Sequence, residues 1–135
     1  IHKTAKLETN NAEIAALTAP RPLLLVSVGG DWTKNTPEVE YPYIRNVYGL
    51  FGRKSHVANS HFADEGHGYQ LSKRQAMYPF MVKHMGLDAN GVLDKSTGVF
   101  DESQTVLEKP ELMRVFDDQH PLPNHALKPG SMVAF

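Results

Sequence analysis

The chain has 135 residues, of which 41% are hydrophobic and 21% charged, values typical of one globular domain or part of a larger one. Its net charge of −1 argues against a nucleic-acid partner, and the lack of an apolar run of about 18 residues argues against a membrane span. Cysteine is absent, which excludes disulfides, thiolate metal sites and a cysteine nucleophile.

The first predicted element is a short helix over residues 10–18. Asn10 or Asn11 can act as its N-cap, and Ile14 and Leu17 would form its apolar edge. The segment APRP then ends the helix, because each proline disfavours helical geometry in the residue before it.

Two segments are predicted to be strands. Residues 23–28, LLLVSV, form an unbroken apolar run between Pro22 and Gly29, which is typical of a strand buried on both faces of a parallel sheet. A buried helix is the alternative, but six residues between such breakers favour a strand. Residues 55–62, SHVANSHF, are the second strand candidate, with a weaker pattern.

Two longer helices are predicted after these strands. The helix over residues 37–51 contains Pro42, which predicts a kink or a later start. Its apolar stripe consists of Ile44, Val47, Tyr48 and Phe51. The helix over residues 71–85 is closed by Gly86. Its apolar face consists of Met77, Phe80, Met81 and Met85, which we expect to pack in the core.

The order helix, strand, helix, strand, helix predicts an α/β fold with parallel strands and flanking helices. Two such strands would expose long edges, so we expect them to be part of a larger sheet. A start at Ile1 rather than at methionine is what a fragment or a processed chain would show. The sequence pattern changes at residue 90, where turn residues begin to alternate with short β-prone pieces. Residues 90–135 are therefore predicted to be a β-rich irregular tail, with a small hairpin around residues 96–98.

Asp31 and His67 each follow a predicted strand directly. Because parallel strands end at the same edge of a sheet, these two side chains can meet there. A carboxylate beside an imidazole fixes the tautomer of the base and stabilises its charged form. The alternative is a turn aspartate and a solvated loop histidine. Glu38 is the rival acid, although a charge at the start of a helix explains it as well.

The segments IAALTAPRPLLLVSVGGDWTKNTPEVE and FADEGHGYQLSKRQAMYPFMVKHMGL resemble the C-terminal part of α/β-hydrolase esterases, especially bacterial acetyl xylan esterase-like proteins. In that family an APRPLL strand precedes the loop of the triad acid, and a later GH loop carries the triad histidine. The resemblance covers about residues 10–88 and implies that Asp31 is the acid and His67 the histidine. Residues 1–89 would then be the C-terminal part of the hydrolase domain, and residues 90–135 its tail or extension.

The resemblance implies a serine esterase that deacetylates a carbohydrate, with a small-molecule or oligosaccharide ester as substrate and no cofactor. The chain departs from the family because it contains no G-x-S-x-G and none of its seven serines lies in such a turn. The nucleophile is therefore expected in a missing N-terminal half, and the fragment alone is predicted to be inactive. The resemblance is compatible with a secreted or periplasmic protein, but the sequence itself fixes neither location nor oligomeric state.

Three more side chains near these loops are candidates for binding. Trp32 directly follows the candidate acid, and it either stacks on a sugar ring or covers the core. Lys73 and Arg74 stand at a helix start, where we expect a solvated face. Pairing with Asp64 or Glu65, or with an acidic sugar, is the alternative for both cations.

Two other function classes remain open at this point. His56, His61, Asp64 and His67 lie within twelve residues and could hold a metal ion. Their spacing is poor, because His56 and His61 would face opposite sides of a strand, and we predict no metal site. A non-catalytic interaction module is the competing class, with a partner surface on the tail from Gly91 to Phe135; a serine nucleophile in the intact polypeptide would exclude it.

Overall fold

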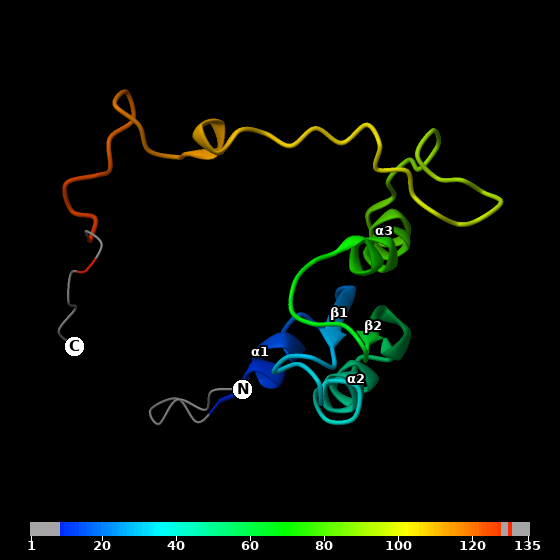
Figure 1. Ribbon diagram of the computed structural model, residues 1–135. Coiled ribbons are helices and arrows are strands. Elements are labelled where there is room, and N and C mark those ends of the chain that lie inside the picture. Colours follow the sequence, from blue (N-terminus) through cyan, green and yellow to red (C-terminus); the bar gives the residue numbers. More distant parts are fainter. Residues whose placement is uncertain (1–8, 128–129, 131–135) are drawn as a thin grey trace. The chain divides into compact units, whose positions relative to one another are not determined.

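The computed structural model describes residues 9–127 and 130, and the chain divides into two units between Asp101 and Glu102. Figure 1 shows the elements along the chain. They are α1 (Asn11–Ala16), β1 (Leu23–Val28), α2 (Glu40–Leu50), η1 (Lys54–His56), β2 (Val57–Phe62), α3 (Leu71–Met85) and η2 (Pro110–Met113).

The sheet of the first unit consists of β1 and β2, which run parallel. The register pairs Leu23 with Val57 at one end and Val28 with Phe62 at the other. Both strands therefore end at the same edge, and the loops that follow them start side by side. The predicted parallel strands and flanking helices are confirmed in this small open sheet.

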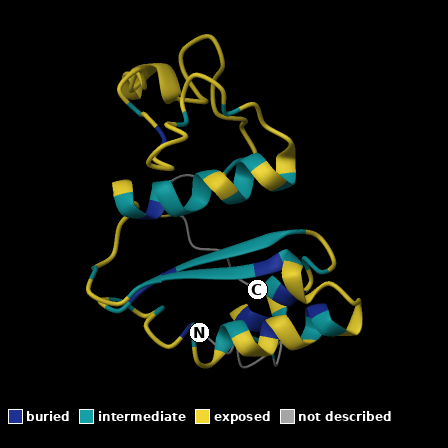
Figure 2. Cartoon of the chain, turned by 90° about the vertical axis from the view of Figure 1, so that its right-hand side faces the viewer, coloured by how far each residue is buried: buried dark blue, intermediate teal, exposed yellow. Residues whose placement is uncertain are grey.

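Helices cover both faces of this sheet, with α1 and α2 on one side and α3 on the other (Figures 1 and 2). The core lies on the side of α1 and α2. Its buried members are Ala12, Ala16, Ile44, Tyr48 and Val57. The Tyr48 hydroxyl donates a hydrogen bond to the Arg21 carbonyl oxygen at 2.6 Å, which anchors α2 to the segment before β1.

The second edge of β1 has no partner strand among the described residues. As a result, Leu23 to Val26 are only half-buried, whereas the sequence predicts burial on both faces. A cavity of about 240 Å³ includes Leu25 and Val26 of this strand in its lining. Glu40 also lines the cavity, and its Oε2 is buried without a hydrogen-bond partner in the described part of the chain.

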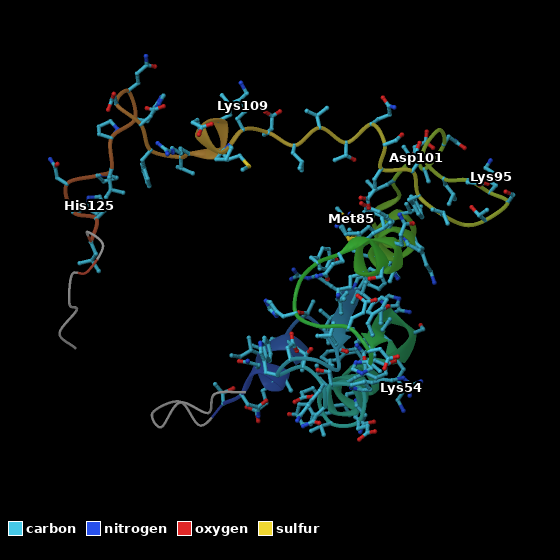
Figure 3. The ribbon with its side chains drawn as sticks, viewed as in Figure 1. Lys54, Met85, Lys95, Asp101, Lys109 and His125 are labelled. Atoms are coloured by element: carbon cyan, nitrogen blue, oxygen red, sulfur yellow. The ribbon has the colours of Figure 1, made fainter. Side chains whose placement is uncertain are left out.

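The helices differ from expectation in which side chains they bury. In α1 the cap is Asn10, as predicted, but Ile14 and Leu17 are exposed, because small alanines face the core instead. In α3 the methionines are half-buried or, for Met85, exposed (Figure 3). Its one buried residue is Lys73. The expected methionine core is therefore wrong for Met85, because a two-stranded sheet is too narrow to cover the whole helix.

Helix α2 begins at Glu40 rather than at residue 37. Pro42 thus lies in the first turn, where a missing N–H costs no intrahelical hydrogen bond, and the predicted late start is confirmed. Strand β2 begins at Val57, after the short helix η1, so the second strand is two residues shorter than predicted.

Residues after α3 form one small antiparallel bridge, between Leu93 and Phe100. Gly98, with φ +72°, makes the predicted turn, and the Phe100 backbone bonds to the Gln75 amide at 2.7 and 2.8 Å. No strand occurs among the described residues beyond α3, so the prediction of a β-rich tail is wrong for them. Turn residues and prolines interrupt each apolar piece before it can pair.

The unit boundary follows Asp101, which is labelled in Figure 3. The division at residue 90, which rests on the change in sequence pattern there and on the extent of the resemblance, stays a prediction. Within the second unit, the Asp117 carboxylate accepts the backbone N–H groups of Gln119 and His120 and lies 3.1 Å from His120 Nδ1. None of the helices in the described ranges is long and apolar enough to cross a membrane.

Candidate active site

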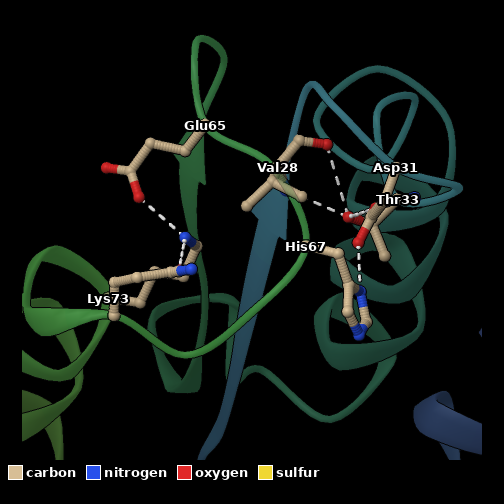
Figure 4. A network of polar contacts seen from close by, with 7 residues as sticks. Val28, Asp31, Thr33, Glu65, His67 and Lys73 are labelled. Atoms are coloured by element: carbon tan, nitrogen blue, oxygen red, sulfur yellow. Dashed lines mark hydrogen bonds and ion pairs between the residues drawn. The ribbon is translucent and has the colours of Figure 1, made fainter.

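Asp31 and His67 meet at the edge where both strands end. Asp31 lies three residues after β1, and His67 lies five residues after β2. The Asp31 Oδ2 atom is 2.9 Å from His67 Nδ1 (Figure 4). The predicted contact is confirmed, and it follows from the parallel, in-register pairing of the two strands.

Thr33 holds the second oxygen of the same carboxylate. Asp31 Oδ1 lies 2.6 Å from both the Thr33 backbone nitrogen and the Thr33 hydroxyl. The Val28 backbone N–H donates to the Thr33 hydroxyl at 2.9 Å (Figure 4). The carboxylate is thereby connected to the last residue of β1, so that its orientation is set by the strand.

These contacts lower the pKa of Asp31 to about 2. The Thr33 hydroxyl is the largest cause, the Thr33 backbone N–H the second, and the hydrogen bond from His67 the third. At neutral pH Asp31 is therefore ionised and can only accept. Because the carboxylate has no proton to give, Nδ1 of His67 must carry the proton, and Nε2 of the neutral ring is left as the basic nitrogen.

Two glycines allow the loops after β1 and β2 to touch. The Gly29 N–H donates to the Phe62 carbonyl at 3.0 Å, and the Gly30 N–H donates to the Glu65 carbonyl at 2.9 Å. A Cβ atom on Gly29 would lie 1.9 Å from the Ala63 carbonyl oxygen. Only a residue without a side chain fits there, and this close approach brings the loop of His67 to that of Asp31.

Lys73 is covered by the loop after β2, which carries His67, and is 1% exposed. Its ammonium is 2.7 Å from Glu65 Oε2 and 2.5 Å from Gln70 Oε1 (Figure 4). The expectation of a solvated helix face is wrong for Lys73, because the loop folds over the start of α3. The pairing with Glu65 that the sequence left as an alternative is present.

A cavity of about 340 Å³ adjoins the pair of Asp31 and His67. The side chain of Asp31 is 12% exposed, whereas that of His67 is 79% exposed. Trp32 lines the cavity and is itself 69% exposed, so the structure places it at the cavity and not in the core. The full lining is Val26, Val28, Asp31, Trp32, Thr33, His67, Gly68, Tyr69 and Lys73.

The other residues that the sequence suggested as an acid or as metal ligands do not join the pair of Asp31 and His67. Glu38 is exposed, and the acid that contacts His67 is Asp31. His56 Nδ1 bonds to the Pro20 carbonyl oxygen at 3.0 Å. His61 Nδ1 bonds at 2.8 Å to the hydroxyl of Ser27, which is buried within the sheet. Across the described ranges, no group of three or more histidine, cysteine, aspartate or glutamate residues could hold a metal ion.

Sequence reasoning missed the role of Thr33 and the burial of Lys73. Thr33 had a usable signal, because a threonine two residues after an aspartate commonly bonds to its carboxylate in a turn. Lys73 had none, because a lysine at a helix start is usually exposed. Its burial depends on how the loop after β2 folds back.

Comparison with known proteins yields one structural neighbour to report. No family model matches the chain, and no curated protein matches it. The solved structure of Methylesterase BT1017 is similar, with 39% identity and a TM-score of 0.67. The match covers 83% of this chain but 23% of that protein, so the chain spans about a quarter of its neighbour's length. The likeness supports an esterase-like fold, and the acetyl xylan esterase-like subtype stays a prediction.

Proposed function

We propose that this chain supplies the acid and the base of a Ser-His-Asp carboxylic ester hydrolase. The observation that carries the proposal is the hydrogen bond between Asp31 Oδ2 and His67 Nδ1, next to an open cavity. The similarity to a methylesterase supports the same class of reaction. No cofactor takes part in the proposed mechanism.

In this mechanism His67 Nε2 takes the proton from a serine hydroxyl, and the serine oxygen attacks the ester carbonyl. Asp31 holds the ring and stabilises the imidazolium that forms. His67 then protonates the leaving alcohol, and the acyl-enzyme remains. Water, deprotonated by the same nitrogen, then attacks the acyl carbonyl. The bond between the acyl group and the serine oxygen breaks, and His67 returns the proton to that oxygen as the acid leaves. In this mechanism the serine lies outside this chain, because none of the seven serines here stands in a G-x-S-x-G turn, and Ser27 is buried in β1 and bonded to His61.

Two kinds of ester are candidates, and they differ in the leaving group. An acetylated carbohydrate is what the resemblance of the sequence implies, and it would release acetate. A methyl ester is what the name of the structural neighbour indicates, and it would release methanol. Trp32 could stack on a sugar ring in either case, because its side chain is exposed at the cavity.

The test uses the full-length protein that carries this chain, assayed with an aryl acetate and with an acetylated and a methyl-esterified oligosaccharide. We expect turnover by the full-length protein, a loss of about 10³-fold or more in kcat for His67→Ala, and no turnover by the 135-residue chain alone. Acetate or methanol release identifies the ester.

A second aspartate–histidine contact provides the control. His120 lies 3.1 Å from Asp117 but follows no strand and belongs to the second unit. His120→Ala should leave kcat unchanged. Full activity of His67→Ala, or hydrolysis by the isolated chain that His67→Ala abolishes, would refute the proposed division of the triad.

A further inference from the structure

The position of His67 needs an explanation beyond its own contacts. The side chain is 79% exposed, and within the described residues it forms one hydrogen bond, to Asp31. Glycines flank it on both sides, so its own backbone neighbours restrict it little. Contacts on either side of His67 must therefore hold its loop in place.

Lys73 makes such contacts on both sides of the histidine. Its ammonium bonds to Glu65, two residues before His67, and to Gln70, three residues after it. The Ser72 hydroxyl donates to the same Glu65 oxygen at 2.8 Å. The backbone of Glu65 accepts the Gly30 N–H at 2.9 Å, which connects this network to the loop of Asp31.

The burial of Lys73 is costly on its own. A lysine at a helix start opposes the helix dipole, and burial of its side chain, which is 2% exposed, removes water from the ammonium. The partners offset this cost, and the bonds from Lys73 and Ser72 lower the pKa of Glu65, which stays ionised opposite the ammonium. Because its charge is already paired, Lys73 is not the group that would bind an acidic sugar.

We propose that Lys73 is a positioning residue for His67. Its hydrogen bonds hold Glu65 and Gln70, on either side of His67, at the start of α3, so that the imidazole stays within hydrogen-bond distance of Asp31. The inference rests on the proposed function for its catalytic consequence, whereas the geometry of the loop can be measured without any activity.

The kinetic test compares three variants of the full-length protein on an aryl acetate. Lys73→Met removes the ammonium, Lys73→Arg keeps a cation, and Lys83→Met makes the same change at an exposed position of α3. We expect Lys73→Met to lower kcat about 10- to 100-fold with KM within about twofold, because a small displacement of the base slows proton transfer and not binding. Lys73→Arg should recover most of kcat, and Lys83→Met should match the wild type.

A double-mutant cycle separates positioning from a general loss of structure. In an Asp31→Ala background the His67 ring has lost its partner, so Lys73→Met should cost little more. Full additivity of the two effects would overturn the proposal. If Lys73→Met fails to fold, Gln70→Ala replaces it, because Gln70→Ala removes one contact of the ammonium and keeps the ion pair with Glu65. A smaller fall in kcat is expected.

A spectroscopic readout is independent of the proposed function. In protein labelled with ¹⁵N-histidine, the imidazole shifts of His67, assigned with His67→Gln, should report the Nδ1–H tautomer in the wild type and a mixture of tautomers in Lys73→Met. Unchanged shifts in folded Lys73→Met would refute the positioning role. Changed shifts together with full activity of His67→Ala would refute the proposed function alone.

Discussion

Both oxygens of the Asp31 carboxylate are engaged, one by Thr33 and the other by His67. These bonds keep the pKa at about 2, below the ordinary value of 3.8. A lowered pKa in the folded state stabilises the fold fully above the unfolded value, and this contribution is lost as the pH falls through the folded value. Asp31 therefore favours folding at pH 4 and above, and the contribution disappears between about pH 4 and pH 2.

Replacing Thr33 by valine tests this account at the level of one side chain. Because the hydroxyl is the largest cause of the shift, Thr33→Val should raise the pKa of Asp31 from about 2 toward 3.8. The remaining bonds from the backbone and His67 should keep it below 3.8. Carboxyl ¹³C NMR titration measures the change.

Asp94 serves as the internal control of the titration. Its pKa is also about 2, but Ser96 and Thr97 cause the shift, so Thr33→Val should leave it there. An Asp31 pKa that does not move would mean that the Thr33 hydroxyl is not its main partner.

At the scale of elements, the site depends on how the loops after β1 and β2 approach each other. The strands were predictable because LLLVSV lies between breakers, and the structure has β1 over the same six residues. The contact between the two loops was less predictable from the sequence. The sequence shows two glycines after β1, but only the folded chain shows that Gly29 faces the Ala63 backbone.

Gly29→Ala should therefore destabilise the protein. Its Cβ would meet the Ala63 carbonyl oxygen, a backbone atom that can move only with its loop. We expect a loss of about 1–3 kcal/mol in the free energy of unfolding, typical of an overpacked site. Urea denaturation of the full-length protein measures it.

Gly66→Ala is the matched substitution in the facing loop. An added Cβ would meet nothing within 4 Å there, and the backbone does not have a positive φ. Its free energy of unfolding should stay within about 0.5 kcal/mol of the wild type. Equal costs for both variants would contradict the steric explanation.

At the scale of the whole molecule, β1 pairs with β2 on one edge only within the described ranges. It is the more apolar strand, yet one edge is unpaired in the described part of the chain. A cavity is lined by Leu25 and Val26 of this strand and by Glu40, whose Oε2 has no hydrogen-bond partner among the described residues. Under the proposed function, a strand from the rest of the hydrolase domain would pair that edge, and a donor from it would satisfy the carboxylate.

Hydrogen exchange can test for this missing strand. Amides in residues 23–28 should exchange more slowly in the full-length protein than in the 135-residue chain, because new bonds would protect the free edge. Amides of α2 around Tyr48 should change less, since that side chain is already buried. Mass spectrometry of proteolytic peptides gives both values, and equal protection of residues 23–28 in the two proteins would argue against the strand.

The sequence by itself determined the local elements and the residues that could react. Breakers, caps and apolar spacing are local properties, so β1, the Asn10 cap and the helix 71–85 could be read from neighbouring residues, as could the positions of Asp31 and His67 after the strands. Only the tertiary structure decided that Asp31 and not Glu38 meets His67, and that Lys73 is buried. These outcomes depend on how the loops after β1 and β2 fold against each other and over the start of α3, which no local pattern encodes.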